Sequence, residues 1–139
     1  MPPDIASAKV LTFADITEMA VVPLGSEGKQ WNRHLFDAAS SGTPQLVADV
    51  IRFEAGFVHH MHRHFHADQI VVPLEGWITM YDEHRTPTEL RVGQASLVPR
   101  HIWHEARNLS GADCVVLHLF AGAGDYSEVG FEAWPGGTA

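Results

Sequence analysis

The chain has 139 residues, of which 45% are apolar, so it is long enough to bury a core as one domain without disulfides. Nine Lys and Arg residues against 17 Asp and Glu residues leave a formal net charge of −8, which opposes binding to nucleic acid or to an anionic membrane surface. No stretch approaches the roughly 18 apolar residues of a membrane span, and the first residues lack a signal-peptide pattern, so we expect a cytoplasmic protein.

In chain order, the first local signal predicts a short helix over residues 12–19. Every later signal is a short strand, predicted at residues 45–54, 69–74, 77–82, 95–98 and 114–120. The last of these contains the single cysteine, Cys114, which we expect to be a small core residue. Residues 122–139 are Gly-rich and are predicted to form a loose tail. Short strands at this spacing favour an all-β fold, an antiparallel sandwich or barrel.

Ten residues are histidines, and five of them lie between residues 59 and 66. His62 and His64 are two residues apart, so in a strand their imidazoles project from one face, with Cα atoms roughly 6.5–7 Å apart. Two such rings are able to share one transition-metal ion, which takes nitrogen ligands at about 2.0–2.2 Å. A third and a fourth ligand must come from elsewhere in the chain, and the candidates downstream are Gln69, on the following strand, and His104, which follows a turn at residues 99–101; spacing alone leaves this choice open.

The full spacing is more specific than this pair. One motif has intervals of five, one, four and six residues and consists of Gly56, His62, His64, Gln69 and Gly76. A second has intervals of five, one, two and three residues and consists of Gly93, Pro99, His101, His104 and Asn108. The two motifs are 16 residues apart and resemble those of the cupin superfamily. Two positions depart from the family pattern, since Gln69 replaces the usual Glu and His101 the usual Gly.

The resemblance covers residues 45–120 and implies a small single-domain cupin, an all-β jelly-roll antiparallel barrel with one divalent metal ion inside. It implies that His62, His64 and His104 hold the ion, with Gln69 in the position of the family's carboxylate. It also divides the chain into an N-terminal segment of strands and loops packing on the barrel (1–44), the barrel core (45–120) and a Gly-rich C-terminal tail (121–139). Because barrels of this family commonly pair, we expect a homodimer.

The fourth ligand stays open at this point. A neutral amide at Gln69 compensates less of the ion's charge than a carboxylate does, which strengthens the ion as a Lewis acid and favours an anionic ligand such as an enolate. Gln69 is alternatively outside the coordination shell, which leaves a three-histidine site. Asp68 satisfies a shorter spacing permitted in the first motif, and a four-histidine site including His66 is a further alternative.

The favoured function is a metal-dependent enzyme acting on a small organic substrate that chelates or enolises, most directly a non-heme Fe(II) dioxygenase-type oxidoreductase. Zn, Ni or Mn are the alternative ions. Candidate acid–base residues are His60, His66 and Tyr81. One alternative is a non-redox isomerase, lyase or cyclase, similar to the polyketide cyclases that resemble this family. The other is a metal-binding or ligand-binding module without turnover.

Overall fold

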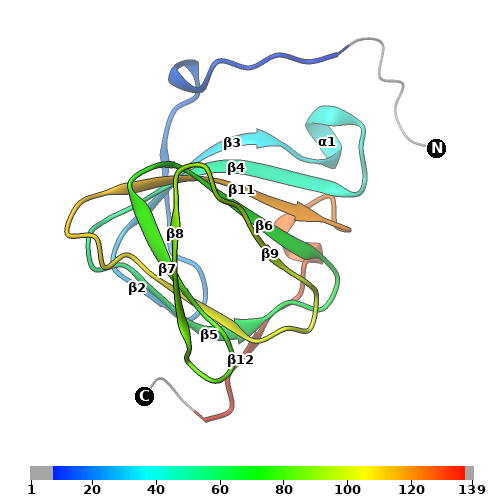
Figure 1. The fold of residues 1–139 in the computed structure, drawn as a ribbon. Coiled ribbons are helices and arrows are strands. Elements are labelled where there is room, and N and C mark those ends of the chain that lie inside the picture. Colours follow the sequence, from blue (N-terminus) through cyan, green and yellow to red (C-terminus); the bar gives the residue numbers. More distant parts are fainter. Residues whose placement is uncertain (1–7, 137–139) are drawn as a thin grey trace.

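In the computed structural model, which describes residues 8–136, two six-stranded antiparallel sheets face each other and enclose the interior of the barrel (Figure 1). Sheet A has the order β1 (Met19–Val21), β3 (Gln30–Phe36), β4 (Leu46–Phe53), β11 (Cys114–Ala121), β6 (Asp68–Glu75) and β9 (Ser96–Val98). Sheet B has the order β12 (Glu132–Ala133), β5 (Val58–Arg63), β10 (His104–Arg107), β7 (Trp77–Tyr81) and β8 (Pro87–Arg91), and β2 (Ser26–Glu27) also pairs with β5. The helical elements are short: η1 (Phe13–Asp15), α1 (Ala38–Ser41) and η2 (Tyr126–Glu128). The predicted all-β jelly-roll class is confirmed.

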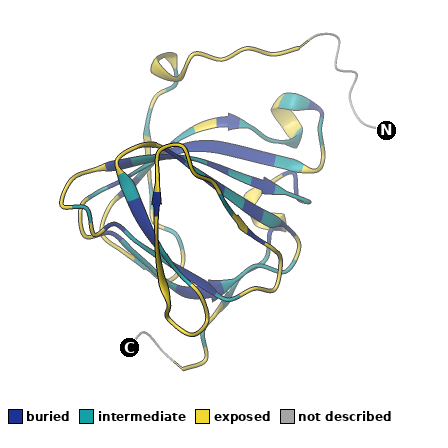
Figure 2. Ribbon diagram, in the orientation of Figure 1, coloured by how far each residue is buried: buried dark blue, intermediate teal, exposed yellow. Residues whose placement is uncertain are grey.

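The strands direct every second side chain into the barrel. Along β11, buried residues alternate with partly exposed ones, as expected for a strand with one face on a core. Cys114 is fully buried there, and this burial raises the pKa of its thiol to about 12, so it is the core residue that the sequence predicted. The central strand β4 is buried along most of its length (Figure 2).

The predicted helix over residues 12–19 is wrong. Only the single 3₁₀ turn η1 forms, and β1 begins at Met19. Arg33 donates hydrogen bonds to the carbonyl oxygens of Phe13 (2.7 Å) and Ile16 (3.2 Å), which a continuing helix would use for its own amides. Beyond the two backbone hydrogen bonds of η1, the segment is therefore held by the side chain of Arg33 on sheet A rather than by a continuing helix.

The predicted loose tail is also wrong for residues 122–136. β12 pairs with β5 next to the histidine motif, and η2 precedes it. Ala123 and Val129 are buried in a cluster with Val47 and Phe120. The Gly-rich composition indicated weak local preference, but a few apolar side chains packed on the barrel are enough to order the segment.

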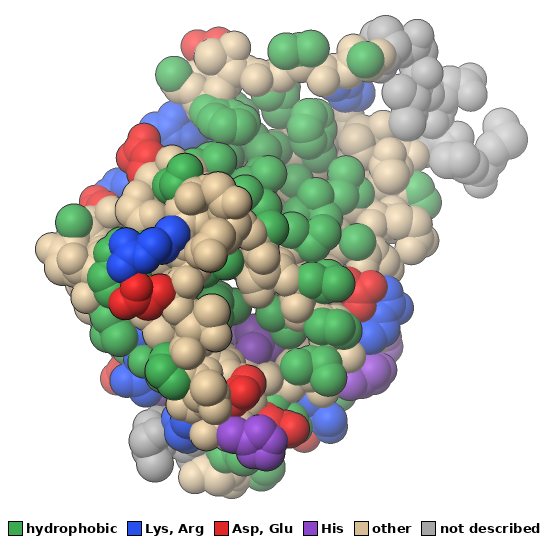
Figure 3. Space-filling view, viewed as in Figure 1, with side chains coloured by type: hydrophobic (Ala, Val, Ile, Leu, Met, Phe, Trp, Pro, Cys, Tyr) green, Lys and Arg blue, Asp and Glu red, His purple; other side chains and the backbone are tan. Residues whose placement is uncertain are grey.

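The outer face of sheet A is apolar as well. Leu35, Ala48 and Val50 pack there with Leu117 and Leu119, and Figure 3 shows a broad hydrophobic surface over these strands. A surface of this kind on a small protein commonly marks an interaction site.

No helix in the described part of the chain is long and apolar enough to cross a membrane.

Candidate metal centre

Three imidazoles from two neighbouring strands converge inside the barrel. His62 lies on β5 and is the direct cross-strand partner of His104 at the start of β10, while His64 follows β5. The nitrogens that the three rings offer to a metal all lie within 4.8 Å of one another. The three ligands that the resemblance implied are therefore brought together by the pairing of β5 with β10.

Backbone carbonyls set the tautomer of each ring. The Nδ1 atoms of His62, His64 and His104 donate to the carbonyl oxygens of His60 (2.6 Å), Gly130 (2.7 Å) and Ile102 (2.9 Å). Because a carbonyl oxygen only accepts, each Nδ1 carries the proton and each Nε2 keeps its lone pair. The rings are thus oriented and protonated as a metal ion requires.

The environment keeps these imidazoles neutral. Burial lowers the pKa of His104 to about 4, and burial together with neighbouring histidines lowers the pKa of His62 far below its usual value. Burial also lowers the pKa of His64. His104 Nε2 is buried without a hydrogen-bond partner among the described residues. Such an orphaned acceptor is costly unless a ligand occupies it, and three neutral imidazoles suit Fe, Zn, Cu or Ni. The donor set therefore fits a divalent transition metal.

A β-bulge in β5 decides which histidines face the interior. His104 pairs with His62 but Ala106 pairs with His59, so β5 has one residue more than β10 between these positions. The amide of Met61 in the bulge donates to the buried carboxylate of Glu105 (3.2 Å). As a result His59, and not His60, shares the inner face with His62, and the two rings stack with centroids 3.9 Å apart.

Gln69 faces the same interior from sheet A. Its Nε2 lies 2.9 Å from Nε2 of His118 on β11, while its Oε1 is buried without a partner among the described residues. Burial lowers the pKa of His118 to about 3, so this ring is neutral and its Nε2 accepts from the Gln69 amide. That hydrogen bond leaves the Gln69 oxygen free for a ligand in the interior.

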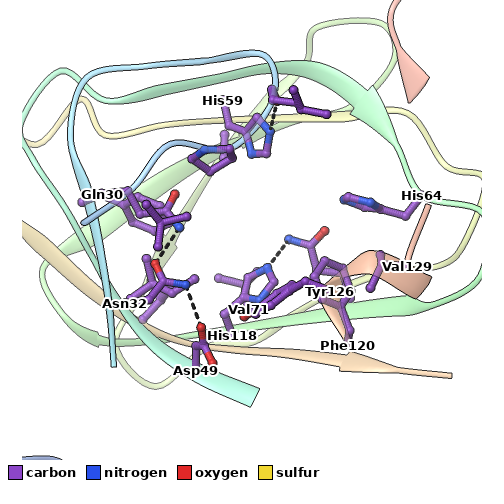
Figure 4. A pocket seen from close by; sticks show the side chains of 18 of the residues that line it. Gln30, Asn32, Asp49, His59, His64, Val71, His118, Phe120, Tyr126 and Val129 are labelled. Carbon is purple, nitrogen blue, oxygen red and sulfur yellow. Dashed lines mark hydrogen bonds between the residues drawn. The ribbon is translucent and has the colours of Figure 1, made fainter. Parts of the chain in front are cut away.

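A cavity of about 770 Å³ contains all of these groups. The three histidines, His59, Gln69 and His118 share its wall with apolar side chains such as Ile51, Phe53 and Val71. Figure 4 shows His59, His64 and His118 arranged around this space, with Phe120 and Val129 beside them. Its volume and its mostly apolar lining are typical of a small-molecule site.

The other predicted site residues lie outside this cavity. His60 contacts Glu27 through Nε2 (2.6 Å), His66 is exposed in the loop after β5, and Tyr81 lies beneath the guanidinium of Arg107. Of the open alternatives for the fourth ligand, Asp68 instead pairs with Arg100 and does not line the cavity, and neither does His66.

The structure also explains how the second motif accommodates His101 where the family usually has glycine. His101 adopts a φ of 71°, in the left-handed region that glycine favours, and its amide donates to the carbonyl oxygen of His64 (2.6 Å). The backbone conformation at this position is therefore retained although the glycine is not.

Sequence reasoning missed Gln30, Asn32 and Asp49, three buried polar residues that also line the cavity. Asp49 lies in a strand that was predicted from its apolar residues alone. One charged residue at an inward position of an apolar strand was the available signal.

Residues 49–120, just over half of the chain, match the family described as "Cupin domain". No curated protein matches the chain. Among solved structures, a predicted oxalate decarboxylase from Thermotoga maritima is 17% identical, with a TM-score of 0.73 over 81% of this chain and 98% of that chain. KdgF from Halomonas sp. is 24% identical, with a TM-score of 0.70 over 86% of this chain and 97% of that chain. The polyketide cyclase RemF from Streptomyces resistomycificus is 20% identical, with a TM-score of 0.72 over 83% of this chain and 80% of that chain.

At these identities the solved structures show a shared fold, and what their names say about activity concerns those proteins. The match to the family covers both sequence motifs and the three histidines that converge in the barrel. The chain therefore belongs to the cupin family.

Proposed function

We propose that this protein is a metal-dependent enzyme acting on a small organic substrate that chelates or enolises, and that it is a non-heme iron dioxygenase-type oxidoreductase. The observation that carries the proposal is the set of three neutral imidazoles with free Nε2 atoms, directed into a mostly apolar cavity of about 770 Å³. Three protein ligands leave open positions for a substrate.

His62, His64 and His104 would hold the ion, and the Gln69 oxygen is the candidate fourth ligand. When bound, a divalent transition metal supplies Lewis-acid activation of substrate oxygens and, as Fe(II), redox chemistry. The carbonyl oxygens of His60, Gly130 and Ile102 keep the ligand rings oriented. The apolar wall excludes water and holds the substrate body, which strengthens every electrostatic interaction inside the cavity.

The test starts from protein purified anaerobically without an affinity tag. We expect about one equivalent of metal per chain, the stoichiometry of a single three-histidine site. After loading with Fe(II), we expect at least one compound in a panel of 1,2-diketones, hydroxyketones and catechols to be consumed together with dissolved oxygen. The same panel with His104→Ala controls for free iron and should consume neither.

Two other results would each point to a different function. Conversion of a compound without oxygen uptake, with zinc, nickel or manganese bound, would replace the oxygenase with a non-redox isomerase, lyase or cyclase. If the protein binds no metal on reconstitution, both enzymatic functions are contradicted, and a binding module without turnover becomes the favoured function.

We also propose that the functional form is a homodimer in which a second copy covers the outer face of sheet A. The N-terminal segment around η1 projects from the barrel, with Val10, Leu11 and Phe13 exposed (Figure 1). It thus adds apolar surface to a sheet face that is already apolar.

Light scattering should give twice the 15.3 kDa chain mass. Leu117→Lys should yield monomers and Val92→Lys, on the exposed turn after β8, should not; a monomeric wild type would contradict the dimer.

A further inference from the structure

The cavity has a second polar group on the wall formed by β3 and β4. Gln30 and Asn32 are buried on β3, and Asp49 on β4 is only 1% exposed. All three side chains line the same cavity as the metal-binding histidines. Figure 4 shows them together on one side of the space, while His64 lies on the other. None of them belongs to the metal centre described above.

These groups form one continuous hydrogen-bonded chain. Gln30 Nε2 donates to Asn32 Oδ1 (2.8 Å), and Asn32 Nδ2 donates to Asp49 Oδ2 (2.7 Å). Asp49 Oδ1 lies 2.6 Å from His34 Nδ1, and His34 Nε2 lies 2.9 Å from Asp37 Oδ2. Asn32, itself held by Gln30, therefore fixes the orientation of the Asp49 carboxylate from inside the barrel. His34 contacts the other carboxylate oxygen from the cavity rim, where its imidazole is 43% exposed.

This group of hydrogen-bonded side chains carries a net negative charge. Burial tends to lower the pKa of His34, but its hydrogen bonds to Asp49 and Asp37 outweigh burial and raise that pKa. A protonated His34 compensates one of the two carboxylates, so one negative charge remains, and a neutral His34 leaves two. In both states this wall attracts a cation or a hydrogen-bond donor and repels an anion.

The carboxylate retains capacity for a further partner. Each carboxylate oxygen accepts about two hydrogen bonds, Asn32 and His34 supply one to each oxygen of Asp49, and the hydroxyl of Tyr126 also faces this carboxylate, so about one acceptor position remains. An almost completely buried carboxylate is costly unless donors surround it. A substrate donor entering from the cavity would complete its environment.

The position of Asp49 relates it to the metal centre. In sheet A, Asp49 is the cross-strand partner of His118, whose Nε2 accepts from Gln69. The metal-binding histidines come from sheet B, on the opposite side of the barrel. A ligand held at both groups therefore spans the interior, with apolar side chains such as Ile51 and Phe53 along its body.

We propose that Asp49, held by Asn32 and His34, binds a hydroxyl or ammonium group at one end of the substrate while the other end chelates the metal. The substrate class is thus a bifunctional molecule with a pair of oxygens at one end, an apolar body and a donor at the other. The chelating end rests on the proposed function, whereas the donor end rests on the hydrogen-bonded chain of β3 and β4.

Three catechols with the same chelating end test this inference. They are 4-ethylcatechol, 4-(2-hydroxyethyl)catechol and 4-(2-aminoethyl)catechol, titrated calorimetrically and anaerobically into zinc-loaded protein. We expect the hydroxyl and ammonium compounds to bind about tenfold more tightly than 4-ethylcatechol, the effect of one hydrogen bond to a charged group. Asp49→Asn keeps the side-chain shape and should remove most of the ammonium preference. Asp113→Asn, at an exposed carboxylate outside the cavity, is the matched control and should retain it.

The outcomes separate the inference from the proposed function. Binding of 4-ethylcatechol that does not depend on zinc would contradict the metal-chelating site. Zinc-dependent binding with equal affinities for the three compounds in wild-type protein would overturn the role of Asp49, and this comparison needs no variant to fold. A preference that survives in Asp49→Asn would overturn it too, and absence of binding by all three compounds would overturn both.

Discussion

His62→Ala and His104→Ala should each lower metal affinity by more than about 100-fold, because even the loss of a hydrogen-bond partner of a ligand costs 10–100-fold. Each change removes one Nε2 donor from a set of three and leaves the remaining two without the geometry that a small ion needs. The measurement is metal content after dialysis, followed by competition with a chromophoric chelator. Circular dichroism should show an intact barrel, since the truncated rings line a cavity.

Two further variants make this result specific. His84→Ala removes a histidine whose side chain is 80% exposed and should retain the full metal content. Gln69→Ala should weaken binding less than the histidine variants, because an amide oxygen is a weaker ligand than an imidazole for such ions. Full metal stoichiometry in both His62→Ala and His104→Ala would contradict a metal site at these histidines. An unchanged affinity in Gln69→Ala would exclude the amide as a ligand.

Asn108→Leu should destabilise the fold by about 3–5 kcal/mol, a magnitude reserved for buried hydrogen-bond networks and large cavities. Asn108 is fully buried and its Nδ2 donates to three carbonyl oxygens, those of Phe53, Glu54 and Ala112. Its Oδ1 accepts from the amide and the hydroxyl of Ser110. Leucine has nearly the same shape but makes none of these hydrogen bonds, so the buried carbonyl oxygen of Phe53 and the partly buried groups of Glu54 and Ser110 lose a partner.

Chemical denaturation of the metal-free protein measures this effect without a contribution from ligand binding. The neighbouring residue provides the control: Leu109 is exposed, so Leu109→Asn should change the free energy of unfolding by less than about 0.5 kcal/mol, as surface substitutions usually do. A loss below about 1 kcal/mol in Asn108→Leu would mean that water or a shifted loop replaces the network.

The strands with strong apolar patterns were predictable. β4, β6, β7, β9 and β11 lie within a residue or two of the predicted ranges. β3 and β10 were missed because their sequences are largely polar, and they are strands because partners on both sides bind their backbone groups. The helix predicted near the N-terminus failed for a related reason, since Arg33, far along the chain, donates to two of its carbonyl oxygens, those of Phe13 and Ile16.

The candidate site shows the same division. His62, His64, Gln69 and His104 were predicted from two motifs that resemble those of cupins, because the order and spacing of motif residues are properties of the chain itself. The structure brings the three histidines together where β5 pairs with β10, and Gln69 faces the same interior from β6. Strand parity gave His60 the inward face of His62, and the bulge in β5 gives that face to His59 instead. A bulge depends on what supports its unpaired amide, here Glu105 on the neighbouring strand, and local periodicity carries no record of that contact.

The sequence by itself determined the all-β class, through alternation and turn spacing, and its two motifs determined the cupin family and the three histidines that converge in the barrel, through their resemblance to that family. Only the tertiary structure decided the protonated nitrogen of each ligand, the ordered C-terminal segment that supplies Gly130, and the polar wall of Gln30, Asn32 and Asp49. These features arise where segments distant in the chain meet, so that burial and hydrogen bonding, rather than local preference, determine what each side chain does.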